Sequence, residues 1–123
     1  MELEKAILER RSIRQFADRP VEEQSLREIL KAAIWAPTGA NAQPWAFICI
    51  TDPAVVHRIR VVSPGMFWDP QAVICVCSDR RKAGKIKAGA VLAQFDCAMA
   101  AQNILLRAFS LGLGSCVIRS TNL

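Results

Sequence analysis

The sequence contains a single histidine, His57, and none of its five cysteines forms a C-x-x-C pair. A structural zinc site is built from four clustered cysteine and histidine ligands, so this pattern argues against one. Each cysteine lies among apolar residues. We therefore expect reduced, buried thiols of a cytoplasmic protein, and we predict no metal site.

Long apolar runs without charge are also missing. Glu2, Glu4 and Lys5 interrupt the start of the chain, which excludes a secretory signal there. The most apolar segment, residues 88–113, contains Asp96 and Arg107 and is more typical of a buried helix than of a membrane span. The chain has no internal repeat, low-complexity tract or linker, and no membrane partner is predicted.

Length and composition are those of one globular domain. The 123 residues are 52% apolar and 22% charged. This is slightly more apolar material than the core of one small monomer needs, which hints at a buried interface with a partner. Lys and Arg number 16 against 11 Asp and Glu, a net charge of +5, which attracts anionic ligands. No helix-turn-helix, RNP or OB signature is present, so we predict no nucleic-acid partner.

Apolar spacing predicts a mixture of helices and strands. Helices are expected over residues 3–11, 22–36, 52–63 and 88–111, buried strands over 46–51 and 72–78, and a third strand over 115–119. Asp52 and Pro53 are typical of a helix start, and Gly112 of a helix end. The elements alternate without strict order, which favours an α+β sandwich around a small mixed sheet. Three strands make a thin sheet for so long a helix, so we expect residues 1–123 to be a single domain that is truncated at its C-terminal side.

Two short stretches are candidates for a binding site. Residues 10–14 (RRSIR) bring three guanidinium groups and a hydroxyl together, a compact set of donors for a phosphate. Residues 37–45 (PTGANAQPW) form a loop of small and polar residues that lets a flat ligand approach the backbone. Taken singly, the first could be a solvated helix end and the second an ordinary turn before a strand. Together they suggest a site for a phosphorylated, planar cofactor.

Three motifs in register resemble the FMN-dependent nitroreductase family. They are RRSIRQF, the helix and loop PVEEQSLREILKAAIWAPTGANAQPWAF, and DCAMAAQNILLRAFSLGLGSC at residues 96–116. The resemblance runs from about residue 10 to residue 120 and covers the N-terminal two-thirds of a typical member. It implies a nitroreductase-like three-layer α/β sandwich and a homodimer with two FMN molecules at the subunit interface.

The resemblance also assigns residues to the cofactor. Arg10, Ser12 and Arg14 match the family's phosphate and ribityl contacts, with Arg11 contributing backbone. The loop reaching the partner subunit's flavin matches Pro37, Thr38, Gly39 and Asn41. The turn after the central helix matches Val117, Arg119 and Ser120, where the family more often has glycine or an acidic residue at the last two positions.

By resemblance, NAD(P)H reduces FMN and a nitroaromatic, quinone or similar electron-poor acceptor then takes the electrons, in a ping-pong cycle. The hydride chemistry belongs to the cofactor, so no catalytic side chain is predicted. Some members carry an Asn and a Lys before the second strand, which residues 65–70 lack; Phe67 and Trp68 there either line the acceptor pocket or pack in the core. The alternative is a truncated or degenerate member that dimerises, with or without flavin, and does not turn over.

Overall fold

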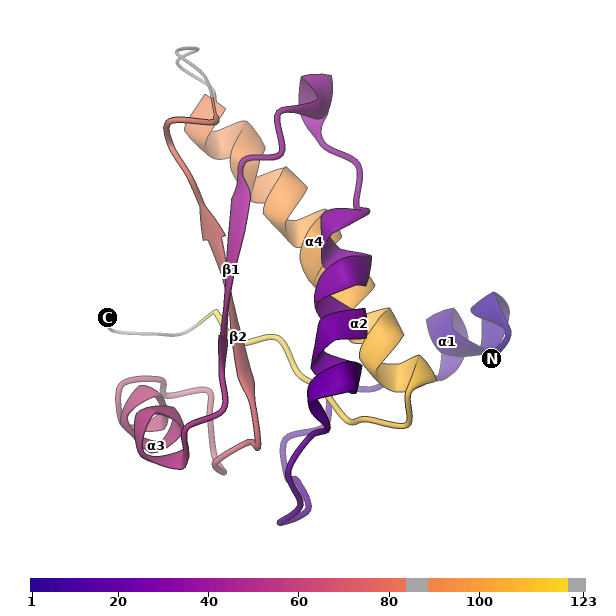
Figure 1. The fold of residues 1–123 in the computed structure, drawn as a ribbon, viewed down its shortest axis with the longest axis vertical. Coiled ribbons are helices and arrows are strands. Elements are labelled where there is room, and N and C mark those ends of the chain that lie inside the picture. Colours follow the sequence, from indigo (N-terminus) through magenta and orange to yellow (C-terminus); the bar gives the residue numbers. More distant parts are fainter. Residues whose placement is uncertain (84–88, 120–123) are drawn as a thin grey trace.

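The computed structural model describes residues 1–83 and 89–119. In chain order its elements are α1 (Leu3–Glu9), α2 (Glu23–Ile34), the 3-10 turn η1 (Gly39–Asn41), β1 (Trp45–Ile50), α3 (Pro53–Val61), β2 (Val73–Ser78) and α4 (Gly89–Ser110) (Figure 1). The α+β class is confirmed, and each predicted helix forms within a few residues of its expected ends.

The helix boundaries follow local chemistry. Asp52 accepts a hydrogen bond from the Ala54 N–H at 2.9 Å, and Pro53 occupies the first turn of α3, as the sequence predicted. Gly112 ends α4 with a φ of 77°, a left-handed conformation that glycine adopts without a Cβ penalty. The Leu113 N–H then donates to the Ala108 carbonyl at 2.9 Å, which satisfies one of the last helix carbonyls.

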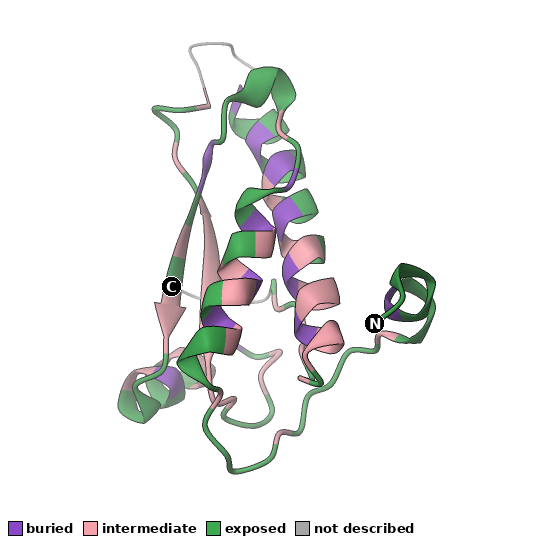
Figure 2. Ribbon diagram, turned by 45° about the vertical axis from the view of Figure 1, so that its right-hand side comes forward, coloured by how far each residue is buried: buried purple, intermediate pink, exposed green. Residues whose placement is uncertain are grey.

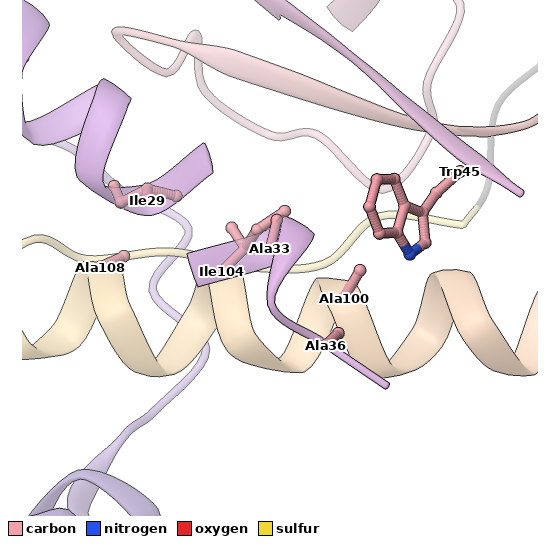
Figure 3. Packing of buried hydrophobic residues seen from close by; sticks show 7 residues of the cluster. All are labelled: Ile29, Ala33, Ala36, Trp45, Ala100, Ile104 and Ala108. Atoms are coloured by element: carbon pink, nitrogen blue, oxygen red, sulfur yellow. The ribbon is translucent and has the colours of Figure 1, made fainter. Parts of the chain in front are cut away.

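The core lies between α2, α4 and one face of the sheet. The side chains that form it are mostly small: Ile29, Ala33, Ala36, Trp45, Ala100, Ile104 and Ala108 (Figure 3). Alanines on the facing sides of α2 and α4 let the two helices approach closely, and buried residues follow those sides in Figure 2. Trp45 reaches into this cluster from β1, whereas Trp35 is 78% exposed at the end of α2.

The sheet has two strands in the described residues. β1 and β2 pair antiparallel, with Phe47 opposite Val76 and Cys49 opposite Ile74. Phe47, Ile74 and Val76 pack against the core. The intervening residues face the other way, and Ile48 among them is 55% exposed. The strands are therefore half-buried, and the prediction of fully buried strands is wrong.

The third predicted strand, residues 115–119, does not form as a ladder. This segment makes one isolated parallel bridge, between Ser12 and Ser115, and has no strand beside it to continue the pairing in the described residues. Its place in the fold still matters, because the bridge ties the chain after α4 to the residues after α1.

α4 is nearly apolar in sequence, but only one of its sides is buried. Length and hydropathy alone would let it cross a membrane, a test that core helices of soluble proteins also pass. Ala93, Ala100 and Ile104 are buried, but Leu92, Phe95 and Met99 are exposed. The expected buried helix is therefore buried on one side only, because no described residue covers its second side.

Candidate functional site

The RRSIR segment follows α1 directly, and its arginines differ in what they bind. The Arg11 guanidinium donates to the carbonyls of Leu8 and Arg10, both at 2.8 Å. Cations at a helix C-terminus stabilise its free carbonyls, so the helix-end interpretation is correct for this side chain. Within the described residues (1–83 and 89–119), the side chains of Arg10 and Arg14 make no hydrogen bond or ion pair with another residue. Two guanidinium groups thus stay available for a ligand.

A close backbone contact fixes this segment against the chain that follows α4. The Ile13 N–H donates to the Ser115 carbonyl at 2.9 Å. Gly114 makes the approach possible, because a Cβ on it would lie 2.9 Å from both Cβ and Cγ2 of Ile13. The contact brings Ser12 and Arg14 beside residues 115–119, so the first and third sequence motifs meet at one place.

A hollow of about 310 Å³ opens at this junction. It is lined by Arg14, Gly65, Phe67, Val117, Ile118 and Arg119. This volume is at the lower end of that of small-molecule sites. Arg14 and Arg119 were both predicted as cofactor residues, and here they line one cavity. Ser120, predicted beside them, lies outside the described residues.

Phe67 forms one wall of the hollow. Its side chain is 58% exposed and lines this hollow, so Phe67 does not pack in the core. Trp68 packs edge-to-face on Phe67 with ring centroids 6.2 Å apart. The next residue, Asp69, contacts His57 Nδ1 at 3.0 Å and Arg60 at 3.4 Å. α3 therefore anchors the loop that carries this aromatic wall.

The Pro37–Trp45 loop has an unusual backbone. Ala40, Asn41 and Gln43 have φ values of 52°, 53° and 50°, a region that costs non-glycine residues energy and that clusters at ligand sites. The Gln43 N–H donates to Thr38 Oγ1 at 3.1 Å, and the Thr38 hydroxyl keeps its own proton free to donate. Pro37, Gly39 and Asn41 are exposed on the same loop.

Asp96 holds this loop to α4. Its carboxylate, in a residue only 8% exposed, accepts a hydrogen bond from the Gly39 N–H at 3.2 Å. From the sequence alone we expect Asp96 to be an exposed or capping carboxylate rather than a catalytic one; the structure shows a buried carboxylate that binds a loop amide. A lone acidic residue in an apolar helix was the signal that could have predicted such a contact.

The two predicted halves of the site do not meet within one chain. η1 is tied to Asp96 near the start of α4, whereas Ser115 lies beyond the end of that helix (Figure 1). Ser110 follows Asp96 by fourteen residues of helix, or about 21 Å at 1.5 Å per residue. The RRSIR segment, bridged to Ser115, thus lies toward one end of α4, and Pro37, Thr38, Gly39 and Asn41 lie toward the other.

The remaining polar groups give no second candidate site. All five cysteines are free, but each is half-buried, so the prediction of buried thiols is wrong. Partial burial raises the pKa of the Cys49, Cys75 and Cys97 thiols, and these three are protonated at neutral pH. The described residues hold no cluster of metal ligands. A larger hollow of about 510 Å³ runs along α2, and none of the predicted site residues lines it.

Sequence reasoning missed part of the hollow. Gly65 gave no signal of its own, because it follows Pro64 in what reads as a simple turn. The loop anchor formed by Asp69 with His57 and Arg60 was also missed, since it depends on the packing of α3. Val117, by contrast, was matched by the resemblance and does line the hollow.

Comparisons with known proteins show which family the chain belongs to. The model of the nitroreductase family matches residues 7–63 and 55–123. A protein of Methanothermobacter thermautotrophicus, named as a candidate NADH dehydrogenase/NAD(P)H nitroreductase, is 40% identical over 117 residues, which are 94% of this chain and 59% of that protein. The chain thus spans about three-fifths of the length of this relative.

Two solved structures share the fold. An FMN-dependent nitroreductase from Clostridium difficile has a TM-score of 0.83 and 31% identity, over 95% of this chain and 66% of that one. A candidate nitroreductase from Desulfovibrio desulfuricans in complex with FMN has a TM-score of 0.79 and 34% identity, over 89% of this chain and 63% of that one. With the family model matching nearly the whole sequence, this chain belongs to the nitroreductase family.

Proposed function

We propose that the chain binds FMN and acts as an NAD(P)H-dependent oxidoreductase of the nitroreductase type. The observation that carries the proposal is the junction of RRSIR with the segment after α4, where Ser12 is bridged to Ser115 and the Arg14 and Arg119 side chains line a hollow with an aromatic wall. Charge-assisted bonds from such groups suit a phosphate and a ribityl chain. The donor set therefore fits this cofactor, and a structural neighbour is in complex with FMN.

Each predicted residue then has a physical task. Arg10, Ser12 and Arg14 hold the phosphate and ribityl chain, and the backbone of Val117 and Arg119 borders the ring. FMN, when bound, supplies two-electron transfer. In the overall reaction a nitroarene, NAD(P)H and a proton would give a nitrosoarene, NAD(P)⁺ and water. Orientation and exclusion of water are left to the protein, so we assign no catalytic acid or base.

A homodimer is the second part of the proposal. Leu92, Phe95 and Met99 repeat at helical spacing on the uncovered side of α4, and Phe95 is 63% exposed. Such a stripe is typical of a helix that packs against a partner. A second copy would cover it and would bring its own Pro37, Thr38, Gly39 and Asn41 loop toward the first copy's hollow. The electrons would pass in a ping-pong cycle to a small, electron-poor acceptor such as a nitroaromatic or a quinone, in the cytoplasm.

Flavin binding tests the proposal directly. The purified chain should take up FMN and show the visible bands of a bound flavin. Arg10→Ala and Arg14→Ala should each raise the Kd for FMN about tenfold or more, because a charge-assisted hydrogen bond is worth roughly 1.5–3 kcal/mol. Arg58→Ala, on the exposed surface of α3, removes the same charge elsewhere and should leave the Kd unchanged.

Two results decide between the alternatives. A chain that stays colourless after FMN addition, or Kd values unmoved by both arginine variants, would refute the flavin site. A chain that binds FMN but does not oxidise NAD(P)H in the presence of a quinone or nitroaromatic would instead support the non-catalytic member of the family.

A further inference from the structure

The charged residues that line the hollow at the RRSIR junction are all positive. Two of its six lining residues are arginines, Arg14 and Arg119, and none is acidic. The carboxylate nearest in sequence to its aromatic wall, Asp69, is already engaged by His57 and Arg60. Anions entering this cavity therefore meet cations with no competing carboxylate in its lining.

The two arginines also differ from most others in the chain. Over residues 1–83 and 89–119, neither Arg14 nor Arg119 forms an ion pair or a side-chain hydrogen bond with the protein. Arginines elsewhere in this part of the chain do pair with carboxylates, namely Arg27, Arg60, Arg81 and Arg107. A guanidinium group left without an internal partner at a cavity is free to bind a ligand.

Arg119 remains without a ligand once Arg14 binds the phosphate and ribityl chain of FMN. Arg14 belongs to the segment that the proposed function gives to the FMN phosphate and ribityl chain, and this inference rests on that proposal. Arg119 comes from the other side of the junction, four residues after the Ser115 carbonyl that receives the Ile13 N–H. The proposed function gives the backbone of Val117 and Arg119 to the flavin ring, which leaves the Arg119 side chain and the Phe67 ring in the lining of the hollow for a second flat ring.

We infer that Arg119 is a specificity residue that selects electron acceptors bearing a carboxylate on an aromatic ring. The carboxylate pairs with the Arg119 guanidinium while the ring lies against Phe67. A guanidinium fork binds a carboxylate through two parallel hydrogen bonds, whereas a neutral amide of the same shape cannot form the charged pair.

Matched ligands separate charge from shape. Binding of benzoate and benzamide to the full chain is measured by calorimetry, first without flavin and then after FMN addition. Turnover is measured as kcat/KM for para-nitrobenzoate and para-nitrobenzamide with NADH. We expect benzoate to bind, and para-nitrobenzoate to react, about tenfold better than the amide, a factor at the low end for a charged hydrogen bond because Arg119 is exposed.

Three variants identify the group responsible. Arg119→Gln should reduce the ratio of the two Kd values, and of the two kcat/KM values, to about one, and Arg119→Lys should restore part of it. Arg58→Gln removes an equal charge from α3, outside the hollow, and should keep the wild-type ratio. Circular dichroism shows whether each variant is folded.

The outcomes distinguish this inference from the proposed function. If the chain binds no FMN but its preference for benzoate disappears in Arg119→Gln, the cofactor proposal fails and the anion site stands. If flavin binds and NADH is oxidised, yet benzoate and benzamide bind equally or Arg119→Gln keeps the preference, the specificity inference is overturned and the enzyme proposal stands.

Discussion

Replacing Gly114 with alanine tests the contact that builds the candidate site. A Cβ at this position would lie 2.9 Å from Cβ and Cγ2 of Ile13 and 3.1 Å from its Cγ1. Cβ is fixed to the backbone and cannot rotate away, so the segment that carries Ile13 has to move. The same residue donates its N–H to the Ser115 carbonyl, and the displacement therefore also strains that hydrogen bond.

The expected cost follows from the size of the overlap. Adding a methyl group to a filled space destabilises a protein by about 1–3 kcal/mol. For a domain of this length, that lowers Tm by about 4–12 °C, since the unfolding entropy is about 2.1 cal/mol/K per residue. Because Ser12 and Arg14 flank Ile13, affinity for FMN should fall together with stability.

Urea denaturation followed by far-UV circular dichroism measures the loss, and a second substitution identifies its cause. Ile13→Gly removes the three atoms nearest to the new Cβ, so Gly114→Ala should cost much less in that background. Gly112→Ala is the matched control: its φ of 77° makes alanine unfavourable, but no atom lies within 4 Å of its Cβ position. Gly112→Ala should cost about 1 kcal/mol whether or not Ile13 is present.

The reasoning fails on either of two results. Gly114→Ala with unchanged stability and unchanged flavin affinity would show that the close approach is not needed. A cost that persists in full when Ile13 is glycine would show that the overlap with this side chain is not its origin.

Two further predictions concern carboxylates. Asp96→Ala should destabilise the chain by about 1.5–3 kcal/mol, because it leaves the Gly39 N–H without its charged acceptor; hydrogen exchange at that amide should accelerate, and Asp96→Asn, which keeps an acceptor, should change both less. Hydrogen bonds from the Arg81 side chain and then from its backbone N–H lower the pKa of Asp79 from 3.8 to about 2. Because the folded pKa is the lower one, this contribution to stability is complete above about pH 4 and is lost as the pH falls toward 2. Arg81→Ala should return the pKa of Asp79 toward 3.8 in an NMR titration, and a pKa that stays near 2 would assign the shift to another group.

Local signals in the sequence predicted the elements well. Asp52 and Pro53 start α3, and Gly112 ends α4, because capping and backbone freedom depend on residues adjacent in the chain. Motif chemistry also located the RRSIR donors and the turn after α4. Their physical contact, through Ile13 and Ser115, joins parts of the chain that are about a hundred residues apart.

Features that depend on what covers a surface were harder to predict. Trp35 carries the same apolar signal as Trp45, yet one is exposed and the other buried, because only Trp45 lies on the face of the sheet that meets α2 and α4. The uncovered side of α4 was not predicted for the same reason, since apolar composition does not distinguish burial within a chain from burial against another chain. Residues 115–119 have strand-forming side chains, but a strand also needs a neighbour of sufficient length.

The distance between the two predicted halves of the site bears on assembly. Within one chain, RRSIR and the Thr38 loop are tied to opposite ends of α4, about 21 Å apart by the helical rise from Asp96 to Ser110. A two-fold axis that set two copies of α4 side by side and antiparallel would bring each loop to the other copy's arginine segment, and would cover Leu92, Phe95 and Met99 in the same step. On this arrangement one contact stabilises the helix and completes the cavity, so flavin binding and self-association are a single coupled equilibrium rather than two independent properties.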